Sequence, residues 1–222
     1  ILYLHGGAYV SGFSMGHWYF LGELYKHTKC HILTPDYPLA PESKADELLP
    51  MMLELYRELI KTIKVENLIV MGDSAGGGLA LALCQSLEKY EQPSDLILLS
   101  PWLDLSMENT DIATIDKDDP ILQIQGLKDS AKAYAGNLDI KDPWVSPLFG
   151  KMNNLPLINI HTGTQDILHP DSVKLHELLL SIDKTHKYHE IENMLHCGML
   201  YPTQEGKISK GLIIKRILNR NK

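Results

Sequence analysis

The sequence LIVMGDSAGGGLALAL, residues 68–83, changes its hydrophobic period at a single serine. Residues 68–71 are apolar, uncharged and partly branched, which is typical of a strand buried on both faces of a sheet. Residues 75–83 contain only glycine, alanine and leucine, and this run predicts a tightly packed helix. Ser74 is therefore predicted to lie at a sharp turn between a strand and a helix.

The residues around Ser74 fit the pattern Gly-x-Ser-x-Gly, with Gly72 and Gly76 on either side. In such a nucleophile elbow the small flanking residues allow a sharp turn that exposes the serine hydroxyl above the sheet. The following helix directs its free amides and positive dipole end at the same point, which suits an oxygen that becomes negative. A phosphate-binding turn is the alternative, but the spacing fits neither Gly-x-Gly-x-x-Gly nor the Walker pattern, and no lysine follows the glycines. We therefore interpret Ser74 as a nucleophile.

Length and composition indicate a single domain over residues 1–222, because 44% hydrophobic residues in a chain of this length can form a substantial core. The net charge of -7 provides no basic field for nucleic acid or anionic membranes. No apolar run approaches the roughly 18 residues that cross a bilayer. Cys30, Cys84 and Cys197 are too few and scattered for a disulfide framework or zinc site, which favours a reducing, cytoplasmic location.

Strand and helix patterns alternate along most of the chain. This alternation is typical of an open, mostly parallel sheet with helices on both faces, so we predict the α/β class. The alternation is interrupted in residues 105–155, which we interpret as a cap-like insertion over the carboxyl edge of the sheet. The predicted strands are 1–4, 31–34, 68–71, 96–99, 157–161 and 186–191, and the predicted helices are 18–28, 46–62, 75–83, 126–135, 171–182 and 203–218.

Two charged runs are predicted to be solvated surfaces. Asp116, Asp118 and Asp119 lack the spacing of a calcium-binding loop, so a metal site is not the preferred interpretation. The basic residues of 207–220 are assigned to the exposed face of a terminal helix rather than to a membrane surface.

A nucleophilic serine needs a histidine to accept its proton and a carboxylate to orient that histidine. In an open parallel sheet both must lie in loops at the carboxyl ends of the strands. Among the ten histidines, His196 alone follows the last strand and precedes the last helix. His186 and His189 are three residues apart in a strand, so their side chains face opposite ways.

Asp166 is the predicted acid, because it directly follows a strand and starts no helix. Asp171 is better placed to cap the helix that begins after it. The resulting order Ser74, Asp166, His196 is the order along the chain that α/β-hydrolases show.

Several motifs in addition to the elbow agree with one family. In order, they are HGGA at 5–8, Tyr37 with LAPE at 39–42, GDSAGG at 72–77, SPW at 100–102 and DPWVSPL at 142–148. Together they resemble the carboxylesterases of the hormone-sensitive-lipase-like group of α/β-hydrolases. The chain departs from that group at Ala8, at Pro38 and in the sequence CGM at 197–199.

The resemblance implies an esterase that uses Ser74, Asp166 and His196, with the amides of Gly6, Gly7 and Ala75 as an oxyanion hole. It implies no metal or organic cofactor, and a small-molecule ester of short to medium acyl length as substrate. It also implies that the first strands and an N-terminal cap segment of the family precede Ile1. An amidase, deacetylase or formamidase with the same triad, or a non-catalytic ligand receptor, is the alternative.

Overall fold

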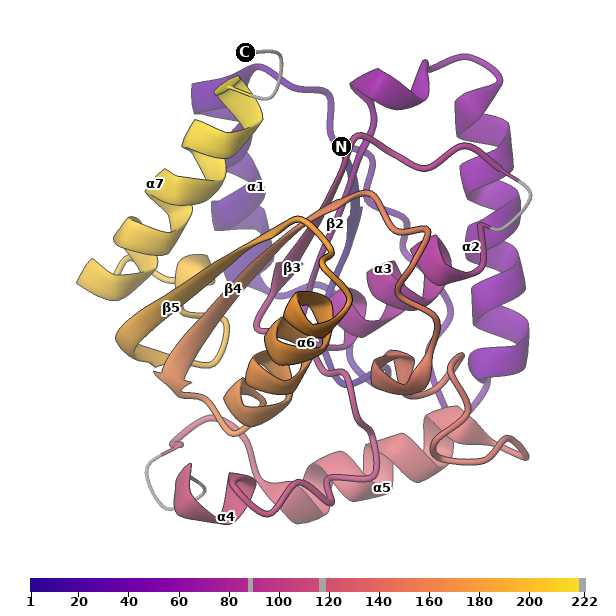
Figure 1. Cartoon of the computed structure of the whole chain (residues 1–222), viewed down its shortest axis with the longest axis vertical. Helices are drawn as coiled ribbons and strands as arrows, with labels where there is room; N and C mark the ends of the chain where they lie inside the picture. The colour runs from indigo at the N-terminus through magenta and orange to yellow at the C-terminus, as the bar shows by residue number, and fades with distance from the viewer. Residues whose placement is uncertain (88–89, 116–118, 220–222) are drawn as a thin grey trace.

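A parallel five-stranded sheet lies at the centre of the computed structural model, which describes residues 1–87, 90–115 and 119–219 (Figure 1). The strands follow one another across the sheet in chain order, and every neighbouring pair is parallel. All strand residues of β2 and β3 are buried. The predicted α/β class with a mostly parallel sheet is therefore confirmed. The strands are β1 (Leu2–Leu4), β2 (Ile69–Asp73), β3 (Asp95–Leu99), β4 (Leu157–Gln165) and β5 (His186–Leu195).

Helices cover both faces of this sheet, as the alternation of elements predicts (Figure 1). Successive strand residues point to opposite faces, so Val70 and Leu98 pack in one apolar layer while Met71 and Ile97 pack in the other. The first layer contains α2 (Ala45–Ile60), α3 (Ala75–Gln85) and α6 (His169–Ser181), and the second contains α1 (Met15–Thr28) and α7 (Gln204–Asn219).

Several elements differ in extent from the prediction. Helix α1 begins at Met15 rather than residue 18, because the Ser14 hydroxyl accepts a hydrogen bond from the amide of His17 and caps the helix. The expected strand 31–34 makes a single parallel bridge, between Leu33 and Leu2. Strands β4 and β5 both extend four residues further than their apolar patterns indicated, to Gln165 and Leu195.

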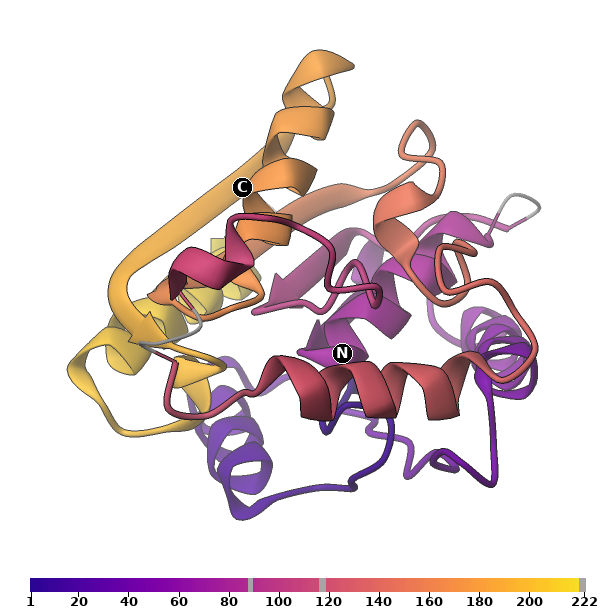
Figure 2. The same cartoon turned by 90° about the horizontal axis from the view of Figure 1, so that it is seen from below.

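The regular parts of the segment between β3 and β4 are α4 (Ile112–Ile115), α5 (Ile124–Ala135) and the short 3-10 turn η2 (Pro147–Phe149). The part of this segment that contains α4 and α5 lies at the carboxyl ends of the strands, across the lower side of the molecule in Figure 1 and towards the viewer in Figure 2. This segment corresponds to the span in which the alternation of strand and helix is interrupted.

Two basic residues of α7 are less solvated than predicted, whereas Lys207 and Lys215 are exposed as predicted. Lys210 is buried and its ammonium lies 4.2 Å from the centre of the Tyr19 ring, while Arg216 forms an ion pair with Asp95. Arg220 lies outside the described residues. No helix among residues 1–87, 90–115 and 119–219 is long and apolar enough to cross a bilayer.

Glycine is required where α3 meets the end of β1. A Cβ atom on Gly76 would lie 2.1 Å from the carbonyl oxygen of Leu4 and 2.4 Å from that of His5. A Cβ on Gly72 would lie 2.2 Å from the carbonyl oxygen of Gly76. Because these neighbours are backbone atoms, they cannot move aside as a flexible side chain would. The glycines therefore set how closely the elbow helix approaches the sheet.

We expect Gly76→Ala to destabilise the protein by about 2–3 kcal/mol or to prevent folding, since overpacking against backbone cannot relax. Gly22→Ala is the matched control, because Gly22 is exposed in α1 and a Cβ there meets nothing within 4 Å. The free energy of unfolding of this control should rise by about 0.5–1 kcal/mol. Urea denaturation followed by circular dichroism measures both, and equal stabilities would contradict the packing argument.

Candidate active site

Ser74 occupies the turn between β2 and α3 in a conformation that few residues adopt. Its φ angle is +52°, and it is the N-cap of α3. Its amide donates to the carbonyl of Leu99 (2.9 Å), and its carbonyl accepts from the amide of Trp102 (2.9 Å). A positive φ in a non-glycine residue costs on the order of 1–3 kcal/mol, so it persists only where its surroundings enforce it. Contacts with the end of β3 enforce it here.

The structure brings together the three side chains predicted for the site. His196 Nε2 lies 3.0 Å from Ser74 Oγ, and His196 Nδ1 lies 2.9 Å from Asp166 Oδ2. All three side chains are buried, and Asp166 is fully buried. Asp166 follows β4 and His196 follows β5 directly, so the carboxyl ends of neighbouring strands place them beside the elbow. This is the arrangement that proton transfer from serine requires.

The protonation of His196 follows from its partners. An ionised Asp166 can only accept, so Nδ1 carries the proton and Nε2 is free to accept from the Ser74 hydroxyl. Burial by itself lowers the pKa of His196, but the Asp166 carboxylate, with Asp119 and Asp73 further away, outweighs burial and raises it. The imidazolium formed during proton transfer is therefore stabilised at this position.

Asp119 is a buried part of this site, which the sequence did not indicate. Its Oδ2 accepts from the amide of Ile167 (3.0 Å), and its Oδ1 accepts from the amides of Ile121 and Leu122 (2.8 and 3.0 Å). It thereby joins the β3–β4 segment to the loop that carries Asp166. The prediction of a solvated residue is wrong for Asp119, while Asp116 and Asp118 lie outside the described residues.

Asp73 receives hydrogen bonds from several parts of the chain, including one from the Cys197 thiol to Oδ2 (3.7 Å). Tyr3 Oη (2.5 Å) and the amide of Gly6 (2.9 Å) donate to Oδ1, and His17 Nε2 lies 3.1 Å from Oδ2. Burial alone would raise the pKa of Asp73, but the hydrogen bonds from His17, Tyr3 and Gly6 outweigh it and lower the pKa. Asp73 therefore stays ionised next to Ser74 and ties the glycine-rich loop to the elbow.

The amide of Gly6, which was predicted for the oxyanion hole, donates to Asp73 in this structure and is therefore already engaged. A cavity of about 230 Å³ opens beside Ser74 and His196. Gly7 and Ala8 line this cavity together with apolar side chains, chiefly Val10, Ile121, Leu122, Leu127, Leu200 and Tyr201.

The sequence did not single out His17 and Asp73 as parts of the site. Asp73 did carry a signal, because a carboxylate at the end of a buried strand needs hydrogen-bond donors. His17 carried none, since it lies in a helix far from the elbow in sequence. Cys197 follows His196, and its sulfur lies 3.4 Å from His196 Nε2, so the departure from the family pattern falls inside the site.

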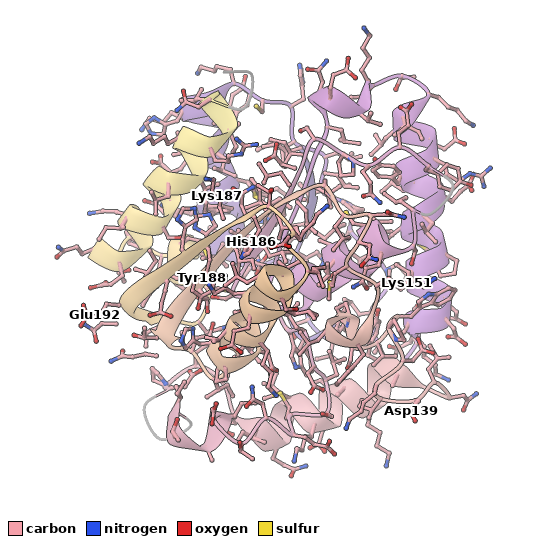
Figure 3. The ribbon with its side chains drawn as sticks, in the orientation of Figure 1. Asp139, Lys151, His186, Lys187, Tyr188 and Glu192 are labelled. Carbon is pink, nitrogen blue, oxygen red and sulfur yellow. The ribbon has the colours of Figure 1, made fainter. Side chains whose placement is uncertain are left out.

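The histidines that the sequence analysis excluded as partners of Ser74 lie elsewhere. His186 and Tyr188 lie in β5 (Figure 3). Both contact His176 of α6, with 2.7 Å between His186 Nε2 and His176 Nδ1 and with the Tyr188 ring stacked on that of His176. His189 faces the other way and packs against His161, as the strand spacing predicts. Among the described residues, no group of three or more His, Cys, Asp or Glu side chains is arranged to hold a metal ion.

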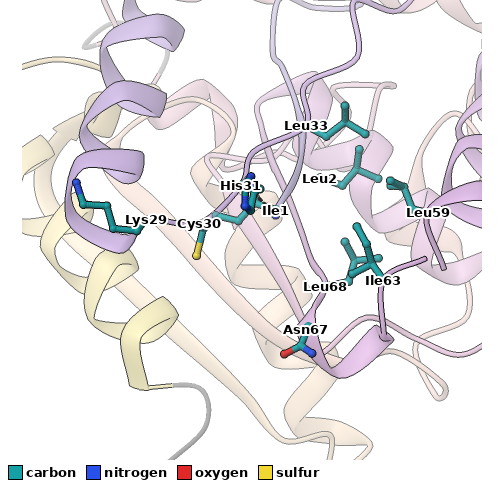
Figure 4. A pocket seen from close by; sticks show the side chains of 10 residues that line it. All are labelled: Ile1, Leu2, Lys29, Cys30, His31, Leu33, Leu59, Ile63, Asn67 and Leu68. Atoms are coloured by element: carbon teal, nitrogen blue, oxygen red, sulfur yellow. Dashed lines mark hydrogen bonds between the residues drawn. The ribbon is translucent and has the colours of Figure 1, made fainter. Parts of the chain in front are cut away.

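A larger cavity, of about 370 Å³, lies at the opposite ends of the strands (Figure 4). It is formed beside the start of β1 and the residues before β2, and its lining includes Leu2, Leu33 and Leu68. Its side chains are mostly aliphatic and include no serine, and Lys29, Cys30 and His31 are its only groups of nucleophile or base type among the residues drawn. The smaller cavity beside Ser74 is therefore the candidate active site.

Known proteins of the same fold are similar to this chain in sequence and in structure. The profile of a family described as alpha/beta hydrolase fold matches residues 1–200. An esterase from Acinetobacter venetianus is 35% identical over 181 residues, which are 80% of this chain and 60% of that protein. A triacylglycerol lipase from Mycobacterium tuberculosis is 35% identical over 178 residues, or 79% of this chain and 36% of that protein. The chain thus spans less than two thirds of either relative.

Solved structures match nearly the whole chain. A hormone-sensitive lipase from a metagenome library has a TM-score of 0.93 at 29% identity and covers 99% of this chain and 77% of its own. A homologue of hormone-sensitive lipase, also from a metagenome library, has a TM-score of 0.94 at 29% identity. The match covers 100% of this chain and 78% of the homologue.

Asp171 lies in the first turn of α6 rather than at its N-cap, because the helix begins at His169. Its side chain is fully buried, Asn109 Nδ2 donates to Oδ1 (2.8 Å), and Oδ2 has no partner among the described residues. Burial, with a contribution from the nearby Asp104, raises the pKa of Asp171 to about 6. Folding therefore shifts the protonation equilibrium of this carboxyl towards its neutral form.

The pKa of Asp171 is higher in the folded than in the unfolded protein. Its favourable contribution to the free energy of unfolding is therefore complete below about pH 4 and is lost as pH rises through about 6. Asp171→Asn should therefore be more stable than wild type by about 2 kcal/mol at pH 8, with little difference at pH 4. Chemical denaturation at several pH values measures this, with the exposed Asp129→Asn as control. A pH-independent difference would show that folding does not raise the pKa of Asp171.

Proposed function

We propose that this chain, which belongs to the alpha/beta hydrolase fold family and to its hormone-sensitive-lipase-like group, hydrolyses carboxylic esters with Ser74 as nucleophile. The observation that carries the proposal is the hydrogen-bonded series from Ser74 Oγ through His196 to Asp166, beside a cavity with apolar walls. The similarity to proteins named esterase and lipase supports the same activity.

In the proposed reaction, Ser74 Oγ attacks the acyl carbonyl carbon while His196 Nε2 accepts the hydroxyl proton. The carbonyl oxygen becomes an oxyanion. As the tetrahedral intermediate collapses, the bond to the alcohol oxygen breaks and His196 returns the proton to the departing alcohol. Water then attacks the acyl-enzyme by the same route and releases the acid. Asp166 holds the imidazole in the required tautomer throughout.

For the oxyanion we infer the amides of Gly7, Ala8 and Ala75. Gly7 and Ala8 line the cavity, whereas the amide of Gly6 is engaged by Asp73. Ala75 is the first residue of α3, and the first amides of a helix have no acceptor within the helix. Each lost donor of this kind typically costs about 100-fold or more in turnover.

For the substrate we infer an ester with a short to medium acyl chain. The cavity has a volume of about 230 Å³, and Ile121, Leu122 and Leu127 of the β3–β4 segment form part of its wall. We accordingly assign residues 105–155 as a cap-like insertion within a single domain of residues 1–222. Long acyl chains would have to displace these side chains or extend into solvent.

Ser74→Ala and His196→Ala should each lower kcat/KM for p-nitrophenyl acetate by at least about 1000-fold, because the nucleophile or its base is lost. Ser181→Ala and His27→Ala, both at exposed positions, should keep wild-type rates. Covalent labelling with a fluorophosphonate provides an independent measurement, and only Ser74→Ala should abolish it completely. Wild-type protein that neither hydrolyses esters nor takes the label would be a receptor, and faster cleavage of the matched anilide would indicate an amidase.

The acyl preference can be measured with a series of p-nitrophenyl esters below their aggregation limits. We expect kcat/KM for the butyrate to exceed that for the dodecanoate by about tenfold, since each further methylene must find apolar surface beyond the cavity. Leu127→Ala should reduce this ratio by widening the wall, whereas Leu218→Ala, at an exposed position in α7, should not. A preference of the wild type for the longer chain would contradict the inferred pocket size.

A further inference from the structure

The glycine-rich loop after β1 contains three successive residues with positive φ. The angles are +121° at Gly7, +52° at Ala8 and +64° at Tyr9. Glycine adopts such angles without penalty, but alanine and tyrosine do so only at a cost of about 1–2 kcal/mol each. Local preference therefore disfavours the conformation in which Gly7 and Ala8 line the cavity. Contacts from elsewhere in the chain must hold it.

Tyr9 makes the contacts that hold this loop. Its side chain is almost fully buried, and its ring lies parallel to that of Tyr134, with 3.6 Å between the ring centres and 1° between the planes. The Trp102 ring lies beside it at 6.1 Å, and the carbonyl of Tyr9 accepts from the amide of Ala40 (2.8 Å). The ring and the backbone of Tyr9 are thus both fixed from outside the loop.

Tyr134 comes from α5, in the segment between β3 and β4, and is itself buried. We propose that Tyr134 is a positioning residue for the reaction: by stacking on Tyr9 it keeps the amides of Gly7 and Ala8 directed at the carbonyl oxygen of the substrate. This inference rests on the proposed ester hydrolysis. It gives α5 a second role, since Leu127 in the same helix lines the cavity.

The size of the effect follows from how strictly an oxyanion hole depends on position. Its donors must lie within hydrogen-bond distance of the oxyanion, and a displacement of about 1 Å can cost on the order of 100-fold. Tyr9 adjoins Ala8, so a rotation about the backbone bonds of Tyr9 or Ala8 moves the amides on either side. Without a ring to stack on, Tyr9 can relax towards a negative φ.

We assign the positioning contact to the ring of Tyr134, which stacks on Tyr9. The hydroxyl oxygen is buried beside the Tyr9 side chain. Tyr134→Phe keeps the stacked ring and removes only the hydroxyl, which makes it the matched control. Tyr134→Leu removes the ring but leaves an apolar side chain in the buried position.

The test compares wild type, Tyr134→Phe and Tyr134→Leu on p-nitrophenyl butyrate below their unfolding temperatures, with active enzyme counted by end-point fluorophosphonate titration. We expect Tyr134→Leu to lower kcat at least tenfold while KM changes less than about threefold, and Tyr134→Phe to match wild type. The inhibition constant of a trifluoromethyl ketone, which becomes an oxyanion when serine adds to it, should rise in Tyr134→Leu by the factor that kcat/KM falls.

Unchanged kcat in folded Tyr134→Leu, or an equal loss in Tyr134→Phe, would overturn the positioning role while leaving ester hydrolysis intact. A loss of kcat without weaker ketone binding would also overturn it, since the oxyanion contacts would then be undisturbed. If Tyr134→Leu does not fold, Tyr134→Met tests the same expectation with a longer and more flexible apolar side chain. Wild type without hydrolysis or labelling would overturn both proposals.

Discussion

The close approach of α3 to the end of β1 is the constraint on which the rest of the site depends. Because Gly76 lies directly against the carbonyl of Leu4, the helix can start immediately after β2, and Ser74 is held at a positive φ where the two elements meet. A larger side chain at Gly76 would move the helix away from the sheet. The nucleophile, its neighbouring amides and the loop after β1 would then lose their common geometry.

Three buried carboxylates surround this turn, and each is stabilised by a different set of donors. Asp73 is held by Tyr3, Gly6 and His17, Asp119 by backbone amides, and Asp166 by His196. Burying a charge is costly unless it is hydrogen-bonded, so these contacts allow negative charge to remain in the interior. Together the carboxylates raise the pKa of His196, which favours the imidazolium that must form when the serine gives up its proton. The local electrostatics thus match the chemistry proposed for the site.

The segment between β3 and β4 connects parts of the site that the sheet alone would leave independent. Asp119 joins it to the loop that carries Asp166, Leu127 reaches the cavity, and Tyr134 stacks against the glycine-rich loop. A change in this segment is therefore transmitted both to the proposed acyl pocket and to the proposed oxyanion donors. Substrate size and turnover are expected to vary together when its residues are substituted.

The sequence by itself determined the strand, turn and helix around Ser74, because their signals are local: an apolar run, small residues and a change of period. It also determined which loops carry Asp166 and His196, since parallel strands bring their carboxyl ends to one edge. Only the tertiary structure decided that Gly6 donates to Asp73, that Asp119 is buried and that Tyr134 stacks on Tyr9. Each of these depends on a contact between segments far apart in the chain, and no local pattern of residues records which partner a buried group will meet.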